Sequence, residues 1–210
     1  MSRKVSILRP GAGLVGRAAR FSTATLGEVT AERGDLPPTI KPLAPDMRVC
    51  GPAITVRSPA RDNLMLHKAI YQAEPGDVLV VKVSGLHEAG YWGEIMTHAA
   101  MHRKIAGLVI DGCVRDAAII EQMRFPVFSR GVCIRGTAKR GGGAVNQMIT
   151  IGTVRIHPGD LVVGDRDGVV VIPRLELAGV LARAEKREQK EDCVKNQLAS
   201  GRTTLDIYGW

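Results

Sequence analysis

Short apolar runs alternate along the chain with longer segments whose apolar residues recur at helical spacing. Three runs of Val, Leu and Ile, at Val78–Val81, Leu161–Val163 and Val169–Ile172, each follow a glycine-containing turn. Apolar runs of this length, bounded by turn residues, predict short buried strands. The turn Asp165-Arg166-Asp167-Gly168 joins the last two runs and predicts a hairpin. Further strands are expected over Cys50–Val56 and within Phe125–Ile134.

Helical spacing marks other segments. Leu64–Ala73 predicts a helix that stops at Pro75-Gly76, and Ser22 or Thr23 caps a shorter one ending at Val29. Leu175–Leu198 is rich in Lys, Arg and Glu, and its apolar stripe is confined to its first turns. The charged remainder is therefore expected to be solvated or to lie against another subunit. The tail Leu205–Tyr208 is expected to return as an edge strand. Strands with helices between and after them indicate an α/β protein.

The stretch Gly90–Asp116 combines both patterns and concentrates polar side chains. A glycine-containing turn leads into an amphipathic helix, and the strand Leu108–Ile110 then delivers Asp111-Gly112 and Arg115-Asp116 into a loop. The helix begins near Gly93-Glu94, so free backbone N–H groups and the positive end of the helix dipole lie beside Glu94. Backbone donors, a guanidinium and two carboxylates suit a small anion together with a metal ion.

Simpler interpretations of the same residues stay open. Arg115 and Asp116 can form a surface ion pair of little energetic value. A glutamate in a first helical turn is stabilised by the dipole without any function. Glu94, His98 and His102 share one helical face, but a span of roughly 12 Å, at 1.5 Å per residue, is too long for one ion to touch all three. A pair of Glu94 with His98 remains. Cys113 lies two residues before Arg115, whose guanidinium could lower the pKa of the thiol.

Composition narrows the classes of protein. The 210 residues suffice for one domain with a sizeable core. The net charge of +8 favours anionic partners, but basic residues form no tract and aromatic content is only 4%, which argues against nucleic-acid binding. No apolar run is long enough to span a bilayer, so no membrane partner is expected. Four separated cysteines without a CxxC pair are typical of reduced thiols, and the predicted location is cytoplasmic.

The N-terminal segment is set apart by its charge. Five basic residues precede Glu28, the first acid, a pattern shared with organelle transit peptides. We expect residues 1–21 to form a poorly ordered extension and residues 22–210 to form a single domain. Gly11–Gly16 matches the GxGxxG pattern of dinucleotide sites. However, Pro10 interrupts the approach to it, and no core strand or closing acid is suitably placed.

Several motifs resemble those of one known family. An acidic residue, twenty intervening residues and Arg-Asp, here Glu94 and Arg115-Asp116, resemble the signature of the class II pyruvate aldolases. Those enzymes act on 4-hydroxy-4-methyl-2-oxoglutarate and 4-carboxy-4-hydroxy-2-oxoadipate, and their superfamily includes the RraA-type regulators of ribonuclease activity. The likeness runs from about Ser22 to Gly209. It also includes Ser22-Thr23-Ala24-Thr25, Gly51-Pro52-Ala53, Val145-Asn146, Asp167–Val171 and Thr204–Gly209.

The resemblance implies a fold and a site. It implies a three-layer β/β/α swivelling-domain fold of the RraA-like type, assembled as trimers or hexamers with sites between subunits. Asp116 would bind Mg²⁺ or Mn²⁺ directly, and Glu94 would bind it through water. A glutamate from the C-terminal helix of a neighbouring subunit would do the same. Glu191 fits the spacing from Asp116 better than Glu188. Arg115 would hold pyruvate, and the N–H groups of Gly93, Glu94, Ile95 and Met96 would hold the substrate carboxylate.

The resemblance also implies a reaction. A 4-hydroxy-2-oxo acid with a second carboxylate would lose its C4 hydroxyl proton, break at C3–C4 and release pyruvate through its enolate. Oxaloacetate would lose CO₂ in the same site as a side reaction. The alternative is a non-catalytic RraA-like regulator that acts by binding a protein. Those regulators typically lack the acid after the arginine, so Glu94 and Asp116 favour the enzyme.

Overall fold

A twisted mixed sheet forms the centre of the computed structural model, which describes residues 7–31 and 34–210. The strand order is β1-β6-β4-β3-β2-β11-β12, and β8 pairs with the end of β2. These strands are β1 (Lys41–Pro42), β2 (Val49–Ser58), β3 (Val78–Val83), β4 (Gly107–Asp111), β6 (Val127–Ser129), β8 (Ala144–Val145), β11 (Leu161–Gly164) and β12 (Val169–Ile172).

The middle of the sheet is parallel. β2, β3, β4 and β6 run in one direction, and helices connect them in turn. The connecting helices are α3 (Leu64–Gln72), α4 (Glu94–His102) and α5 (Ala117–Gln122). Because parallel strands end at a common edge, the segments that follow β2, β3 and β4 lie close together there. The predicted strands and helices of this region are all present, with bounds shifted by a few residues.

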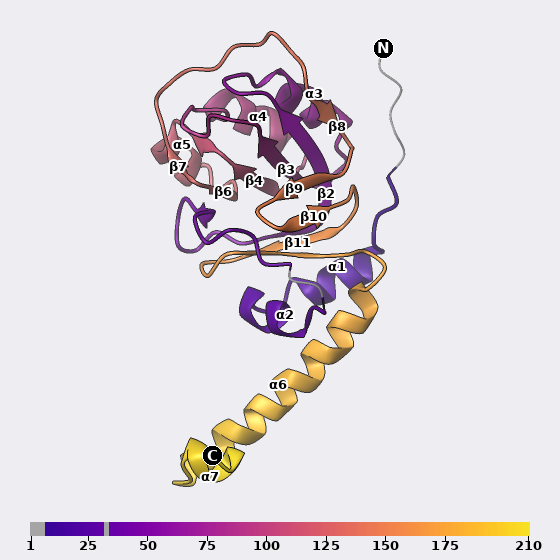
Figure 1. Ribbon diagram of the computed structural model, residues 1–210, viewed down its shortest axis with the longest axis vertical. Helices are drawn as coiled ribbons and strands as arrows, with labels where there is room; N and C mark the ends of the chain where they lie inside the picture. The colour runs from indigo at the N-terminus through magenta and orange to yellow at the C-terminus, as the bar shows by residue number, and fades with distance from the viewer. Residues whose placement is uncertain (1–6, 32–33) are drawn as a thin grey trace.

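Alternating side chains of the sheet divide the core into two layers. On β3, Leu79, Val81 and Val83 pack with α3, α4 and α5, whereas Val78 and Val80 face the opposite side. That side is covered by a hairpin of β9 (Ile149–Ile151) and β10 (Val154–Ile156). The arrangement in Figure 1 is therefore a layer of helices, the sheet and a second β layer. The predicted β/β/α fold is confirmed.

A third cluster joins the N-terminal segment to the β11–β12 hairpin. α1 (Ala12–Ala18) and α2 (Thr23–Val29) pack against β11, β12 and the first turns of α6 (Leu177–Ala199). Ser22 caps α2 by accepting a hydrogen bond from the Thr25 amide, as the sequence predicted. The expectation of a poorly ordered extension is wrong for residues 7–21, because α1 buries Ala18 there and Phe21 enters the same core. Residues 1–6 lie outside the described part of the chain.

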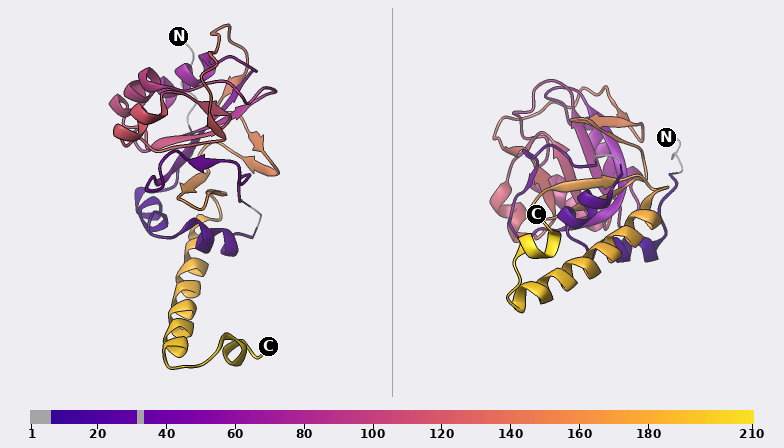
Figure 2. Two further views of the ribbon diagram at one scale, coloured as in Figure 1. Left: turned by 90° about the vertical axis from the view of Figure 1, so that its left-hand side faces the viewer. Right: turned by 60° about the horizontal axis from the view of Figure 1, so that its bottom comes forward.

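The C-terminal arm, residues 186–210, leaves the body of the molecule. Figures 1 and 2 show α6 projecting from the end opposite α4 and α5, with α7 (Thr204–Tyr208) at its tip. The predicted edge strand over Leu205–Tyr208 is wrong. Thr203 and Asp206 form a reciprocal capping box that starts a short helix instead. Across residues 7–31 and 34–210, no helix has the length and apolar character needed to cross a bilayer.

Candidate active site

Two segments that follow neighbouring parallel strands meet at the carboxyl edge of the sheet. The chain after β4 forms β5 (Cys113–Val114) and runs alongside residues 90–92, which precede α4. The Tyr91 amide donates to the Cys113 carbonyl at 3.0 Å, and the Arg115 amide donates to the Trp92 carbonyl at 2.8 Å. These bonds bring Arg115 and Asp116 to the first turn of α4.

Two glycines make this close approach possible. A Cβ atom on Gly93 would lie 2.4 Å from Oδ2 of Asp116 and 3.3 Å from Nε of Arg115. A Cβ atom on Gly90 would lie 2.7 Å from the Cys133 carbonyl and 3.0 Å from Cβ of Arg115. A side chain at either position would therefore displace the loop that carries the arginine and the aspartate.

Asp116 is held in an orientation that leaves part of its carboxylate free. Its backbone is left-handed, with φ of 58°, a conformation that aspartate tolerates better than most residues. Oδ2 accepts a hydrogen bond of 3.0 Å from the Glu94 amide, and Nε of Arg115 lies 3.7 Å from the same oxygen. The positive end of α4 thus stabilises the negative charge of Asp116. One of the four N–H groups expected to bind a substrate carboxylate is used for this purpose.

Six of the predicted residues line one cavity of about 260 Å³. Gly93, Glu94, Ile95 and Met96 contribute the start of α4, and Arg115 with Asp116 contributes the loop. In the described part of the chain, the amides of Ile95 and Met96 have no hydrogen-bond acceptor. The cavity therefore brings together backbone donors, a cation and two carboxylates.

Several further residues that line the cavity were not predicted from the sequence. Asn63 and His67 lie one turn apart at the start of α3, and Thr137 and Lys139 come from the loop after β7 (Gly131–Val132). Asn63 follows β2, so it belongs to the same sheet edge as Asp116. Its position could have been inferred only if the order of the parallel strands had been known. Lys139 adds a second cation to the cavity beside Arg115.

Asp62 anchors the segments that carry these lining residues. Its buried carboxylate accepts hydrogen bonds from the amides of Leu64, Arg140 and Gly141. Burial alone would raise the pKa of Asp62, but these three amides and the charge of Lys139 outweigh it and lower the pKa. Burial also lowers the pKa of His67, and Lys139 adds to this effect, so the ring is neutral at pH 7. Lys139 is consequently held near the cavity by an anchored loop.

The oxygen donors of the cavity suit a divalent metal ion. Mg²⁺ and Mn²⁺ bind through one or two carboxylates together with waters and substrate oxygens. Asp116 and Glu94 supply two carboxylates at one end of the cavity, and the side-chain oxygen of Asn63 is buried without a donor. Residues 7–31 and 34–210 contain no group of three His, Cys, Asp or Glu side chains placed to hold an ion. The residues thus fit a hard ion that keeps part of its water shell.

Other candidates from the sequence take ordinary roles. Nε2 of His98 lies 3.7 Å from Oε1 of Glu94, an exposed pair on the surface of α4. The expectation that Arg115 could lower the pKa of Cys113 is wrong, because burial and the neighbouring Cys133 raise it. Glu191 pairs with Arg187 on its own helix at 2.9 Å. Figures 1 and 2 place α6 far from α4, so neither Glu188 nor Glu191 reaches the cavity of its own chain.

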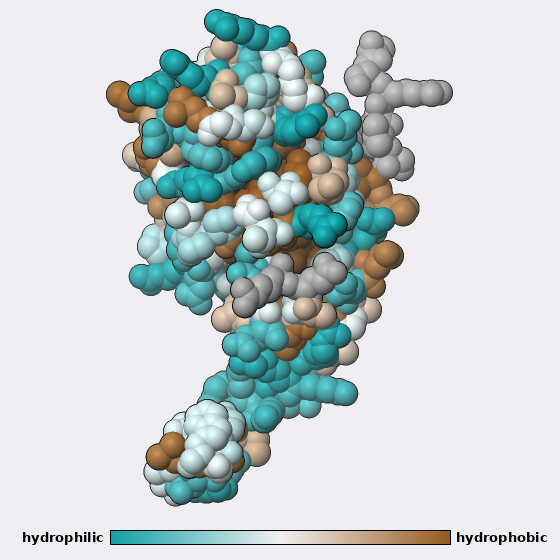
Figure 3. Space-filling model, viewed as in Figure 1, coloured by the Kyte–Doolittle hydropathy of each residue, from teal (hydrophilic) through white to brown (hydrophobic). Residues whose placement is uncertain are grey.

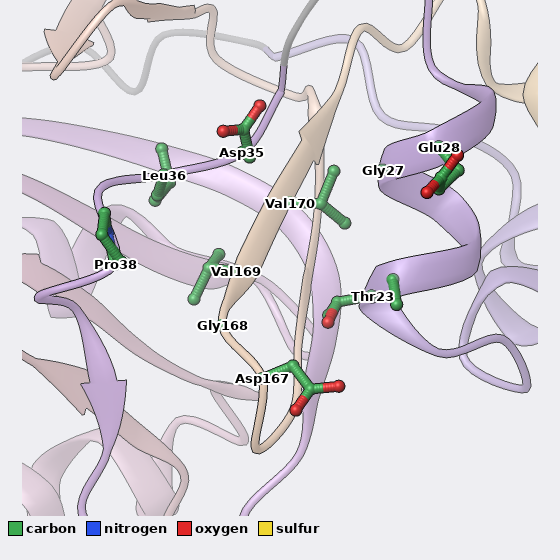
Figure 4. Close-up of a pocket in the computed structure, with 11 residues that line it drawn as sticks. Thr23, Gly27, Glu28, Asp35, Leu36, Pro38, Asp167, Gly168, Val169 and Val170 are labelled. Carbon is green, nitrogen blue, oxygen red and sulfur yellow. The ribbon is translucent and has the colours of Figure 1, made fainter.

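A larger hollow of about 630 Å³ lies between α2 and the β11–β12 hairpin. Figure 4 shows the carboxylates of Glu28, Asp35 and Asp167 spread around it rather than converging. Its described lining contains no lysine or arginine, so it is unsuited to an oxo acid. The cavity beside Arg115 is therefore the candidate active site.

The fold and the site together define a class of protein. The fold is mixed α/β. The cavity lies at the carboxyl edge of the parallel strands and is lined by an arginine, an adjacent aspartate and the N-terminus of a helix. The family model described as "RraA-like: Aldolase/RraA" matches residues 19–171. The chain belongs to the RraA-like family.

Individual relatives agree with this assignment. A protein of Halalkalibacterium halodurans, named "Putative 4-hydroxy-4-methyl-2-oxoglutarate aldolase", is 38% identical over 174 residues, which cover 83% of each chain. A solved structure of an uncharacterized Pseudomonas syringae protein is 33% identical, with a TM-score of 0.83 over 93% of this chain and 96% of that one. A Streptomyces coelicolor structure, described as an unusual member of the RNase ES inhibitor RraA protein family, is 29% identical. Its TM-score is 0.80 over 90% of this chain and 99% of that one.

Proposed function

We propose that this protein is a divalent-metal-dependent aldolase. It cleaves a 4-hydroxy-2-oxo dicarboxylic or tricarboxylic acid to pyruvate and a keto acid, with oxaloacetate decarboxylation as a side activity. The observation that carries this proposal is the placement of Arg115 and Asp116 against the N-terminus of α4 in one cavity. The name of the Halalkalibacterium halodurans relative supports the same activity.

The residues of this chain would bind and orient the substrate. The free amides of Ile95 and Met96 bind the C1 carboxylate, as helix N-termini bind anions. The guanidinium of Arg115 pairs with the C2 oxygen, where negative charge develops as the C3–C4 bond breaks. Lys139 and the neutral His67, which line the same cavity, would bind the second carboxylate of the substrate. Asp116 would hold Mg²⁺ or Mn²⁺, which supplies a Lewis acid that stabilises charge on the C2 oxygen.

Proton transfer would depend on the glutamates. Glu94, at the edge of the cavity, takes the C4 hydroxyl proton through an intervening water. The C4 hydroxyl becomes a carbonyl, the C3–C4 electron pair passes into the pyruvate enolate, and C3 then takes up a proton to give pyruvate. Oxaloacetate loses CO₂ and gives the same enolate.

Exposed apolar groups on the C-terminal arm suggest that it binds a second copy of the chain. Figure 3 shows a hydrophilic shaft with apolar atoms at its tip, where the rings of Tyr208 and Trp210 stack. On the body, Ile95 beside the cavity and Ile134 on the following loop are 77% and 92% exposed. Apolar groups exposed at both places are typical of surfaces that associate. We propose that the arm of one copy covers the cavity of another in a trimer or hexamer and brings Glu191 to it.

Removing the Glu191 carboxylate tests this arrangement. Glu191→Gln is expected to lower kcat at least about 10²-fold, as the loss of a proton-transfer group does. Asp192→Asn, which changes an exposed neighbouring carboxylate, is the matched control and should keep wild-type kcat. Deletion of residues 186–210 is expected to lower both the mass of the assembly, measured by light scattering, and kcat. A monomeric full-length protein with full activity would contradict the proposal.

The experiment that tests the activity is a pyruvate-release assay. Wild-type protein is expected to release pyruvate from 4-hydroxy-4-methyl-2-oxoglutarate and from oxaloacetate with Mg²⁺ or Mn²⁺, and this release should stop when EDTA is added.

The structural relative described as an RNase ES inhibitor family member favours a second candidate function, that of a regulator that binds a protein. Absence of turnover with either ion and both substrates would favour the regulator.

A further inference from the structure

One buried carboxylate at the sheet edge has no part in the proposed reaction. Asp111 is the last residue of β4, and its side chain is 0% exposed. Nζ of Lys82 lies 2.5 Å from its Oδ2, and Nε of Arg130 lies 2.5 Å from its Oδ1. Lys82 is the direct partner of Asp111 on β3, and Arg130 follows β6 on the other side. We call Lys82, Asp111 and Arg130 the Asp111 triad.

We propose that Asp111 is a positioning residue for the candidate active site, which it orders by fixing the loop that carries Arg115 and Asp116. The inference rests on the proposed function. A carboxylate in this position needs its partners, because a buried charge without them is costly. Burial alone would raise the pKa of Asp111, but the hydrogen bonds and charges of Lys82 and Arg130 outweigh it and lower the pKa. The Asp111 carboxylate is therefore ionised at neutral pH.

Arg130 holds the loop in two ways. Its side chain binds Asp111, and its amide donates to the Gly112 carbonyl at 3.0 Å. The next residues form β7, which pairs with β5, and the Cys133 amide donates to the Val114 carbonyl at 2.8 Å. Residues 112–114 are thus hydrogen-bonded along one side to residues 130–133. Asp111 holds Arg130, the first residue of that supporting segment, in place.

The other side is held by His87. Its Nδ1 lies 2.7 Å from the Asp111 carbonyl, and its own carbonyl accepts a hydrogen bond from the Cys113 amide at 3.0 Å. The segment 111–114, which immediately precedes Arg115 and Asp116, is consequently hydrogen-bonded to His87 on one side and to residues 130–133 on the other. Loss of the carboxylate would leave Lys82 and Arg130 as neighbouring cations that repel each other. Arg130 would move, and β7 and the site loop would move with it.

The chain offers a matched control at the opposite end of β3. Asp77 is also almost fully buried, and Arg9 binds both of its carboxylate oxygens at 2.8 Å. Asp77 precedes β3, whereas the Asp111 triad lies at its carboxyl end, so the two ion pairs are alike but only one adjoins the site. Asp77→Asn and Asp111→Asn should both lower stability against urea.

The two variants should differ in the site. In folded Asp111→Asn, kcat for oxaloacetate is expected to fall about 10²-fold, because small displacements of catalytic groups have effects of this size. Exchange of the Cys113 and Arg115 amide hydrogens should also become faster. Asp77→Asn should keep the wild-type values of both. Equal kcat and equal exchange in the two folded variants would overturn the proposal.

A second pair of variants keeps the proposal testable if Asp111→Asn does not fold. Arg130 is partly exposed, so Arg130→Gln is expected to fold, with lower kcat and faster exchange at Cys113 and Arg115. Arg130→Lys restores a cation and should regain most of both. Wild-type behaviour of Arg130→Gln would overturn the proposal. If the wild type releases no pyruvate, the proposed function fails, and the exchange rates alone decide whether the triad orders the loop.

Discussion

Replacement of Arg115 by methionine is expected to lower kcat for pyruvate release at least about 10²-fold, because preorganised charge at a developing oxyanion is usually the largest catalytic contribution. The side chain is half exposed and its nearest ionic contact, with Asp116, is a loose 3.7 Å. The backbone of Arg115, rather than its side chain, ties the loop to Trp92. The fold should therefore survive the substitution, and the loss should be confined to activity.

Steady-state kinetics and thermal unfolding of the same preparations measure this result. Arg155→Met is the matched control, because Arg155 is an exposed arginine on β10, in the layer away from the cavity. It should leave kcat unchanged. Arg115→Lys should retain less than wild-type activity, since an ammonium group cannot pair with two oxygens as a guanidinium does. Full activity of Arg115→Met would remove Arg115 from the mechanism.

Gly93→Ala is expected to have an effect of similar size from a single added methyl group. The new Cβ would lie 2.4 Å from Oδ2 of Asp116, so the carboxylate must move away and lose its bond to the Glu94 amide. The backbone of Gly93 is extended, with φ of −160°, which alanine adopts without strain. Stability should fall by only about 1 kcal/mol, the usual value of one hydrogen bond, whereas kcat should fall about 10²-fold.

The control for this change is Gly16→Ala in α1. A Cβ atom there meets nothing within 4 Å, and alanine favours a helix by about 1 kcal/mol relative to glycine. Gly16→Ala should therefore be at least as stable as wild type and fully active. A fully active Gly93→Ala protein would mean that Asp116 need not lie against the start of α4.

Local patterns predicted most elements of the fold. The apolar runs gave β3, β11 and β12, and the stretch Gly90–Asp116 gave α4 and β4 with the loop after them. α1 was missed because its two glycines, together with Pro10 and Gly11 before it, resemble a turn. α7 was assigned to a strand because Leu205, Ile207 and Tyr208 suit one, but the capping box of Thr203 and Asp206 decided its conformation.

The site could be predicted only where its residues are close in sequence. One helix–strand–loop unit carries Glu94, Arg115 and Asp116. Their spacing in the sequence therefore indicated that the three side chains lie in one site. Asn63 precedes this helix–strand–loop unit in the sequence, and Lys139 follows it. Only the order of the strands in the sheet brings both residues beside it. Asp111 was visible in the sequence, but its partners are distant: Lys82 lies on β3, and Arg130 follows β6. The metal ion and the role of Glu191 stay predictions.

The most direct test of the account is a titration of Mg²⁺ and Mn²⁺ into wild-type and Asp116→Asn protein, followed by pyruvate release from both substrates. Wild-type activity is expected to rise from zero with the ion. Asp116→Asn protein, although folded, is expected to stay at least about 10²-fold below wild type. Asp116→Asn protein that cleaves at the wild-type rate, with the same dependence on the ion, would contradict it.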